Sequence, residues 1–302
     1  MTATDGPLRS RDADHVNGRP RDMARPPVPP PLPVPVVDSH CHLDIADGDN
    51  WLDVETAIEE ARQANIIGIV QVGCDVPGSR WAADLASKQA NVHATVALHP
   101  NEAPRIHGEG GLELLEAAWS EIEKLAALPQ VRGIGETGLD FYRTPPEGRG
   151  VQEESFRRHI DMAKRYDKVL VIHDRDAHDD VVRVLLDEGA PDNVVFHCFS
   201  GDERLARTCA RHGWHMSFAG TVTFKSAHDL RDALRTAPTE LLLVETDAPY
   251  LTPTPHRGRP NASYLVPWTV RSMAETRNQD VSQLAAALYD NSARLFGSFT
   301  DA

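Results

Sequence analysis

Residues 34–44 read VPVVDSHCHLD, an apolar run that passes directly into Asp38, Ser39, His40, Cys41 and His42. The apolar part is typical of a buried β-strand. Side chains two residues apart in a strand lie on the same face, so both imidazoles should point to one place. Two neutral imidazoles aimed at one point are good ligands for a divalent cation. The stretch therefore predicts a strand that ends in a metal-binding pair.

Seven more short apolar runs follow along the chain, separated by segments with helical periodicity. The expected strands are IIGIVQVGC, VHATVALHP, VRGIGETGL, KVLVIHD, NVVFHCFSG, WHMSFAG and LLLVETDAP, and the expected helices include 52–65, 112–128, 151–166, 177–188 and 281–296. Such alternation indicates a parallel sheet, and eight strands match a (β/α)8 TIM barrel of ~250 residues. The alternative, an open doubly wound sheet, usually has a Gly-rich turn after its first strand, and none is present here.

Composition narrows the class of protein. The chain has 302 residues, is 41% hydrophobic and carries a formal net charge of −14. Such an acidic chain is not expected to grip duplex nucleic acid with an extended basic groove, although metal ions and a few arginines could still bind phosphates. No apolar run approaches the ~20 residues of a membrane span, and the N-terminus lacks the apolar core of a secretory signal. The four cysteines show no disulfide-framework spacing, so a cytoplasmic location without membrane association is expected.

The first 35 residues differ from the rest of the chain. Mixed charges and glycines come first, and RPPVPPPLPVP follows at residues 25–35. This run is expected to be extended polyproline II, and residues 1–35 are expected to form a disordered arm. Residues 36–302 would then be the barrel domain. A Pro-rich arm could also serve as a ligand for an SH3-type domain, which leaves a non-catalytic adaptor as one reading.

Ionisable residues close nearly every expected strand. In a barrel these strand ends all lie at one mouth, where barrel enzymes carry out their chemistry. A single histidine at a strand end is usually a hydrogen-bonded structural residue, but several imidazoles and carboxylates converging on one face are costly to bury without a cation. So large a set suits two metal ions that share a carboxylate. The residues at the strand ends are His40, His42, His99, Glu136, His173, His197 and Asp247.

Several of these segments match known motifs as an ordered set. The sequence resembles the TatD family of metal-dependent deoxyribonucleases over nearly all of its length after residue 35. The matching segments are DSHCHLD, ALHPNEA, GETGLDFYR, HDRDA, HCFSGD, SFAGTVTFK, VETDAPYLTPTPHRGRPN and NSARLF. The chain departs from the family pattern at Ala97, where glycine is usual, and after Asn261, where the usual proline is missing. The H-x-H pair alone is shared by the wider amidohydrolase superfamily.

The resemblance implies a metal centre and a reaction. His40 and His42 would bind a first divalent ion with Asp247 and Glu136. Glu136 would also bridge to a second ion, which the two histidines at 173 and 197 would complete. Asp247 would take a proton as water attacks phosphorus. Residues expected near the substrate phosphates are His99, Arg257, Arg259 and Asn261.

These implications favour a 3′–5′ exodeoxyribonuclease that acts on single strands or 3′ ends of DNA. Its two ions would be Mg²⁺, Mn²⁺ or Zn²⁺, and no obligate protein partner is expected. The alternative enzyme is an amidohydrolase-type barrel that cleaves amides, lactones or phosphotriesters. Such barrels commonly bridge their metals with a carboxylated lysine, whereas this sequence has Glu136 at that position. The remaining histidines on expected helices, His159 among them, are expected to be solvated.

Overall fold

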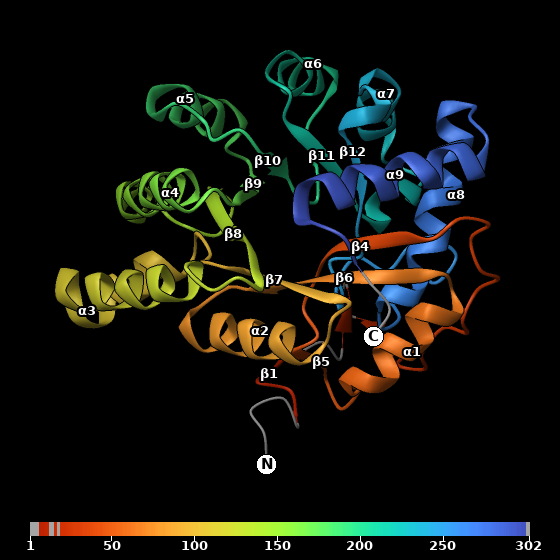
Figure 1. Ribbon diagram of the computed structural model, residues 1–302, viewed down its shortest axis with the longest axis horizontal. Helices are drawn as coiled ribbons and strands as arrows, with labels where there is room; N and C mark the ends of the chain where they lie inside the picture. Colours follow the sequence, from red (N-terminus) through yellow and green to blue (C-terminus); the bar gives the residue numbers. More distant parts are fainter. Residues whose placement is uncertain (1–5, 12–14, 17–18, 300–302) are drawn as a thin grey trace.

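Eight parallel strands form one closed sheet at the centre of the protein (Figure 1). The computed structural model describes residues 6–11, 15–16 and 19–299. The strands run in the order β12-β11-β10-β9-β8-β7-β6-β4 around the sheet. Their bounds are β4 (Val36–Cys41), β6 (Ile66–Gly73), β7 (Val92–Val96), β8 (Val131–Asp140), β9 (Val169–Arg175), β10 (Val194–Phe196), β11 (His215–Phe218) and β12 (Leu242–Val244).

Hydrogen bonds just beyond β12 close the sheet into a barrel. The backbone N–H of Asp247 donates to the carbonyl of His40 at 2.9 Å, and that of His42 donates to the carbonyl of Ala248 at 2.8 Å. Beside them, the buried Asp38 carboxylate accepts hydrogen bonds from the backbone N–H and the hydroxyl of Thr246. The expected (β/α)8 barrel is confirmed, and its closing seam fixes the ends of the two strands that carry expected metal ligands.

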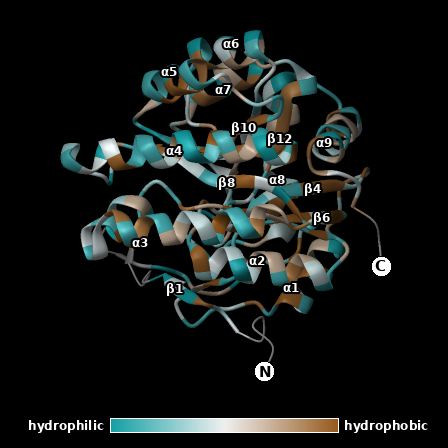
Figure 2. Cartoon of the chain, turned by 60° about the vertical axis from the view of Figure 1, so that its left-hand side comes forward, coloured by the Kyte–Doolittle hydropathy of each residue, from teal (hydrophilic) through white to brown (hydrophobic). Residues whose placement is uncertain are grey.

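Helices surround the barrel as an outer layer. Figure 2 shows hydrophilic residues on the outward faces of these helices. Among the described residues, no helix combines the length and the apolar character that crossing a membrane requires. The helices are α1 (Val54–Gln63), α2 (Val76–Lys88), α3 (Glu102–Ala126), α4 (Pro146–Tyr166), α5 (His178–Glu188), α6 (Glu203–His212), α7 (His228–Thr236), α8 (Val266–Arg277) and α9 (Val281–Phe296), with short 3-10 turns η1 (Gly220–Thr223), η2 (Thr239–Leu241) and η3 (Ser263–Leu265).

Helix α3 begins ten residues before its expected start at residue 112. The sequence predicted only the second part of this helix, because Gly110 and Gly111 interrupt the helical backbone. Gly111 has a φ of +68°. Glycine adopts this left-handed conformation without the steric cost that a side chain would impose. The helical pattern therefore resumes at Leu112, where the sequence predicted the helix to start.

An apolar plug fills the N-terminal end of the barrel. Phe299, which follows α9, packs there so closely to β6 that a side chain added at Gly68 would meet its ring at 2.4 Å. The polar strand ends therefore lie at the opposite, C-terminal mouth. The plug consists of Val37, Val70, Val169, Val171, Val195, Leu243, Leu295, Phe296 and Phe299.

The described part of the N-terminal arm packs against the barrel instead of standing free. Pro26, Pro29 and Leu32 are buried. These three residues are spaced by three, the period of the polyproline II helix expected for this run. The Tyr264 hydroxyl donates to the Pro26 carbonyl at 2.8 Å, and Arg271 of α8 donates to the Pro30 carbonyl. This packing differs from the expected disordered arm, and the division of the chain at residue 35 stays a prediction.

His159, expected to be solvated, is instead fully buried on α4. Its Nε2 accepts a hydrogen bond from the backbone N–H of Leu98, and its Nδ1 donates to the Ser155 carbonyl at 2.6 Å. That prediction was wrong because helical periodicity alone did not reveal which face of α4 meets the barrel. Burial lowers the pKa of His159 to about 4.

The lowered pKa of His159 makes the fold sensitive to acid. The unfolded chain takes up this proton near pH 6.5, whereas the folded chain resists it until about pH 4, so stability is lost as the pH falls between these values. His159→Gln, which keeps a donor and an acceptor but does not titrate, should lose roughly 2–3 kcal/mol less than the wild type between pH 7 and 4.5. Urea unfolding at both pH values measures this. His212→Gln, at the exposed end of α6, is the control, and equal acid losses in the wild type and the His159 variant would contradict the assignment.

Candidate metal centre

The carboxyl ends of five strands bring six expected ligands to the mouth of the barrel. Alternation along each strand directs these side chains inward, and the closed barrel places their ends around one point. Four of the six are buried, and His173 and Asp247 are partly exposed. The six are His40 within β4, His42 directly after β4, Glu136 within β8, His173 within β9, His197 directly after β10, and Asp247 shortly after β12.

One group of donor atoms surrounds the pair at the end of β4. The Nε2 atoms of His40 and His42 lie 3.3 Å apart. Glu136 Oε2 is 3.6 Å from the first and 3.9 Å from the second, and Asp247 Oδ1 is 3.8 and 3.4 Å from them. Atoms that share a tetrahedral ion at about 2.1 Å lie roughly 3.4 Å from one another. The spacing therefore fits a single divalent ion among these groups.

A second group of donors surrounds the other oxygen of Glu136. Oε1 lies 2.5 Å from His173 Nδ1, 2.8 Å from His197 Nε2 and 3.4 Å from His99 Nε2. The two oxygens of one carboxylate thus face two different sets of imidazoles. His99, expected near the substrate phosphate, lies close enough to Glu136 and His173 to be a metal ligand with them. In the described part of the chain, all the residue groups with ligand-like spacing belong to this one centre.

The centre combines buried carboxylates with imidazoles whose pKa values are shifted. Burial by itself would raise the pKa of Glu136, but the imidazoles of His197 and His99 outweigh it and hold that pKa well below its usual range. Burial and then His197 lower the pKa of His40 to about 3, so His40 is a neutral donor at pH 7. Burial would lower the pKa of His197, but the carboxylates of Glu136 and Glu245 hold it well above its usual value. A divalent ion bound here would take over the stabilisation of these buried carboxylates. The donor set therefore fits metal binding.

Three imidazoles of the centre are held through their second ring nitrogen. His42 Nδ1 bonds the Val72 carbonyl at 3.2 Å. His173 Nε2 lies 3.3 Å from Asp140 Oδ2, and His197 Nδ1 lies 3.2 Å from Glu245 Oε1. Such partners fix the ring orientation and the tautomer of metal-binding histidines.

Sequence reasoning missed the two carboxylates that hold these rings. Asp140 and Glu245 belong to the quoted segments GETGLDFYR and VETDAPYL, so their acidic side chains near strand ends were the available signal. Cys74 was also missed, although its Sγ lies 3.6 Å from Glu136 Oε2 and 3.8 Å from His42 Nδ1. A cysteine after an apolar strand resembles a packed core residue, so nothing in the sequence distinguished it.

The backbone also directs Asp247 toward the centre. Its φ is +53°, in the left-handed region that aspartate tolerates better than most residues. The seam hydrogen bond from its N–H to His40 fixes this conformation. A residue held in a sparsely populated conformation beside a cluster of ionisable groups is a common feature of functional sites.

The loop after Asp247 positions the three expected phosphate-binding residues in different ways. Asn261 is buried, and its amide nitrogen donates to the carbonyls of Thr246 and Tyr250, so the side chain shapes the loop. This differs from the expected role at a phosphate, because its donors are already used. The Arg257 guanidinium lies 4.2 Å from the centre of the Phe224 ring. Arg259 Nε lies 3.1 Å from Asp22 Oδ2 in the arm.

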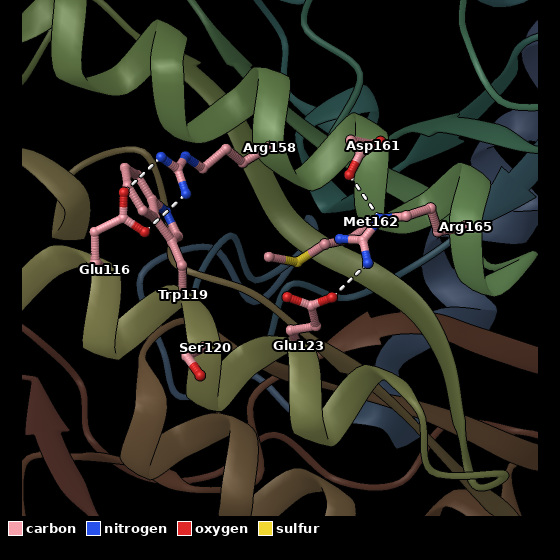
Figure 3. Close-up of a pocket in the computed structure, with 8 residues that line it drawn as sticks. All are labelled: Glu116, Trp119, Ser120, Glu123, Arg158, Asp161, Met162 and Arg165. Carbon is pink, nitrogen blue, oxygen red and sulfur yellow. Dashed lines mark hydrogen bonds and ion pairs between the residues drawn. The ribbon is translucent and has the colours of Figure 1, made fainter.

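A separate hollow of about 150 Å³ lies between α3 and α4 (Figure 3). Its charged side chains pair with one another: Arg158 with Glu116, and Arg165 with Glu123. The Arg158 guanidinium also covers the Trp119 ring at 3.9 Å. The hollow belongs to the outer helical layer and includes none of the residues of the metal centre.

The closed barrel and the donor set at its mouth define a metal-dependent hydrolase. Comparison with known families gives the particular group: the model described as "TatD related DNase" matches residues 37–297, and the chain belongs to that family.

Relatives in sequence and in structure agree with this assignment. The chain is 44% identical to the "Uncharacterized metal-dependent hydrolase TatD" of Mycobacterium tuberculosis, over 87% of this chain and 98% of that protein. It is 38% identical to the "Uncharacterized metal-dependent hydrolase YcfH" of Escherichia coli K12, over 86% of this chain and 95% of that protein. Among solved structures, the TatD homologue YJJV of E. coli superposes with a TM-score of 0.77 at 27% identity, covering 87% of this chain and 98% of that one.

Proposed function

We propose that the protein is a 3′–5′ exodeoxyribonuclease with two divalent ions at the mouth of the barrel. The observation that carries this proposal is the position of Glu136, whose two carboxylate oxygens face separate groups of imidazoles. A carboxylate between two ions about 3.5–4 Å apart is the usual arrangement of two-metal phosphodiesterases. The family description, a relation to DNases, supplies the substrate class.

The residues divide into two ligand groups in this proposal. His40, His42 and Asp247 would hold one ion, and His173 and His197 the other. Glu136 would serve both. His99 stands beside the second group, where it would either complete it or approach the substrate phosphate. Arg257 and Arg259, on the loop after Asp247, remain candidates for binding phosphates further along the strand.

Asp247 is the proposed general base. When bound, divalent ions supply a water of lowered pKa and withdraw charge from a phosphoryl oxygen. Burial would raise the pKa of Asp247, but the hydrogen bond to His42 and the other neighbouring imidazoles outweigh it and lower that pKa. Asp247 is therefore ionised at neutral pH and able to accept a proton as water attacks phosphorus. The partial exposure of its side chain leaves it open to substrate.

An exposed aromatic residue beside the centre suits a single strand. Tyr142, two residues after β8, is 65% exposed, and the Arg175 guanidinium lies 3.9 Å from its ring centre. Arg175 follows His173 by two residues in β9, so the pair lies close to the ligands. An aromatic face with an adjacent cation can stack a base and attract a phosphate without reading sequence.

Removing the Tyr142 ring should weaken binding of DNA without affecting the chemistry. Tyr142→Ala is expected to raise KM for a single-stranded oligonucleotide roughly tenfold with kcat nearly unchanged, because stacking contributes about 1–3 kcal/mol per base. Tyr142→Phe, which keeps the ring, should behave like the wild type. Steady-state kinetics on both variants test this. Equal KM values for the alanine variant and the wild type would show that the ring does not contact substrate.

The proposed activity is tested with DNA labelled at different positions. Single-stranded DNA with a 3′ label or an internal label is incubated with metal-loaded protein, with and without chelator. The expected result is early loss of the 3′ label and a ladder that shortens from that end, abolished by chelator. A covalently closed single-stranded circle should stay intact. Cleavage of the circle would contradict the exonuclease mode, and intact linear DNA would contradict nuclease activity itself.

The amidohydrolase alternative is distinguished by small substrates. Metal-loaded protein that turns over bis-nitrophenyl phosphate but no amide or lactone supports the phosphodiesterase proposal. Turnover of an amide or lactone with DNA left intact would favour the alternative. Removal of residues 1–33 should leave metal-dependent hydrolysis unchanged if the protein is an enzyme, whereas loss of all function would favour the adaptor. The free state of Cys41, Cys74, Cys198 and Cys209 is consistent with the proposed cytoplasmic location.

A further inference from the structure

The N-terminal arm reaches the rim of the metal centre. We propose that the arm forms part of the substrate-binding surface and that Arg11 binds a phosphate of the DNA strand. This inference rests on the proposed nuclease function and extends it, because it assigns a binding residue to a segment outside the residues that match the family, 37–297.

Strand pairing places the arm beside the ligands of β4. Strand β1 (Arg9–Arg11) pairs in parallel with β5 (Ile45–Asp47), which begins three residues after His42. The backbone N–H of Leu8 donates to the Asp44 carbonyl at 2.8 Å, and that of Gly48 donates to the Arg11 carbonyl at 3.2 Å. The arm therefore extends the loop that leads away from the metal-binding pair.

A buried carboxylate anchors the arm to two loops of the mouth. Asp47 is 1% exposed and accepts two hydrogen bonds of 2.7 Å from Arg11 and two more from Arg21. Arg21 also donates to the carbonyl of Gly258, in the loop that follows Asp247. The arm thus connects the loop after His42 with the loop after Asp247, and an expected metal ligand precedes each loop.

The two arginines of β1 differ in how many carboxylates surround them. Arg9 pairs with both Asp44 and Asp75. Arg11 pairs, among the described residues, with Asp47 alone, and Asp47 also pairs with Arg21. Arg11 is therefore less neutralised by carboxylates than Arg9.

The Tyr250 ring lies between Arg11 and the metal centre. Its guanidinium lies 4.9 Å from the centre of the Tyr250 ring, and that ring lies 6.3 Å from the His42 ring. The Arg11 side chain is 19% exposed. Its Nε and Nη2 are bound to Asp47, while Nη1 donates no hydrogen bond to any described residue. Nη1 is thus available for a phosphate oxygen.

A guanidinium held in this way is well suited to bind a strand that extends from the centre. The bidentate contact with Asp47 and the stacking on Tyr250 fix its geometry before substrate arrives, so little conformational entropy is lost on binding. The barrel positions the metal ligands through its own strands. Arg11 is therefore expected to contribute to affinity for the strand and not to bond cleavage.

The test compares a DNA strand with a small diester. Arg11→Gln in the full chain should raise KM for a twelve-nucleotide single strand roughly tenfold with kcat unchanged, because a charge-assisted hydrogen bond is lost. Turnover of bis-nitrophenyl phosphate, which is too short to reach Arg11, should stay at the wild-type level. The salt dependence of log KM should become shallower by about 0.7, the value for one phosphate contact on a single strand. Arg11→Lys should keep the salt dependence and part of the affinity.

The controls separate this inference from the proposed function. Arg207→Gln, on the exposed face of α6, makes the same charge change and should leave every parameter unchanged. Wild-type protein that cleaves DNA with the same KM and salt dependence as Arg11→Gln would overturn the inference alone. A parallel fall in turnover of the small diester would also overturn it, because Arg11 would then act through the structure of the loops. Wild-type protein that cleaves the diester but no DNA would overturn both proposals.

Discussion

Replacing Glu136 by glutamine is expected to lower kcat on single-stranded DNA by about 10³-fold, which corresponds to about 4 kcal/mol of transition-state stabilisation. Glutamine has nearly the same shape as glutamate but carries no charge. One of its two terminal atoms is an amide nitrogen, which donates and does not coordinate a cation. Whichever way the amide turns, one of the two imidazole groups around Glu136 loses its carboxylate oxygen.

The measurement combines single-turnover kinetics with metal content. The Glu136 variant should lose at least one bound ion per chain, and added metal should restore only part of the rate. Glu121→Gln, at a partly exposed position on the outer side of α3, is the matched control for the same chemical change. A Glu136 variant with wild-type kcat and metal content would remove the basis for a shared carboxylate.

Replacing Asp247 by asparagine is expected to reduce kcat by about 10²–10⁴-fold through a different cause, the loss of a general base. Asp247 Oδ1 lies 3.4 Å from His42 Nε2, at the edge of the centre and not between the two imidazole groups. The variant should therefore keep the ion held by His173 and His197. The Asp247 variant should therefore lose most of its rate and keep bound metal, whereas the Glu136 variant should lose both.

The pH dependence distinguishes the two roles further. The neighbouring imidazoles lower the pKa of Asp247, so the wild-type rate should fall in acid as this carboxylate is protonated. Asparagine does not titrate, and the acid limb assigned to Asp247 should be absent in the variant. Asp229→Asn, at an exposed position of α7, is the control. An unchanged acid limb in the Asp247 variant would assign the proton transfer to another group.

The barrel and the gathering of its strand ends could be predicted because both depend on local patterns. An apolar run followed by an ionisable residue is visible in each segment, and barrel closure brings these segments to one mouth without further information. His40 and His42 needed only the two-residue period of a strand. Glu136 could be proposed as a shared ligand because its strand lies between those of the other expected ligands.

The partners of the ligands could not be predicted because they depend on pairings over long distances in the sequence. Glu245 meets His197 across 48 residues, and Asn261 uses its amide on the carbonyls of Thr246 and Tyr250. His159 was misjudged for the same reason, since its partner Leu98 lies 61 residues away.

The arm shows a different limit of sequence reasoning. A Pro-rich, charged segment has the composition of a disordered chain, and its buried face recurs at every third residue, a period that neither a helix nor a strand template detects. The anchoring of Arg11 and Arg21 by Asp47 likewise depends on a carboxylate more than twenty residues away. Composition therefore missed both the packing of the arm and its short strand β1, which pairs with β5.

The proposed function depends on whether two divalent ions share Glu136 at the mouth of the barrel. Crystals of the full chain grown with Mn²⁺ test it most directly, through the anomalous scattering of the bound ions. Two peaks per chain are expected, one beside His40 and His42 and one beside His173 and His197, with the Glu136 carboxylate between them. A single peak, or two peaks of which only one contacts Glu136, would contradict this proposal.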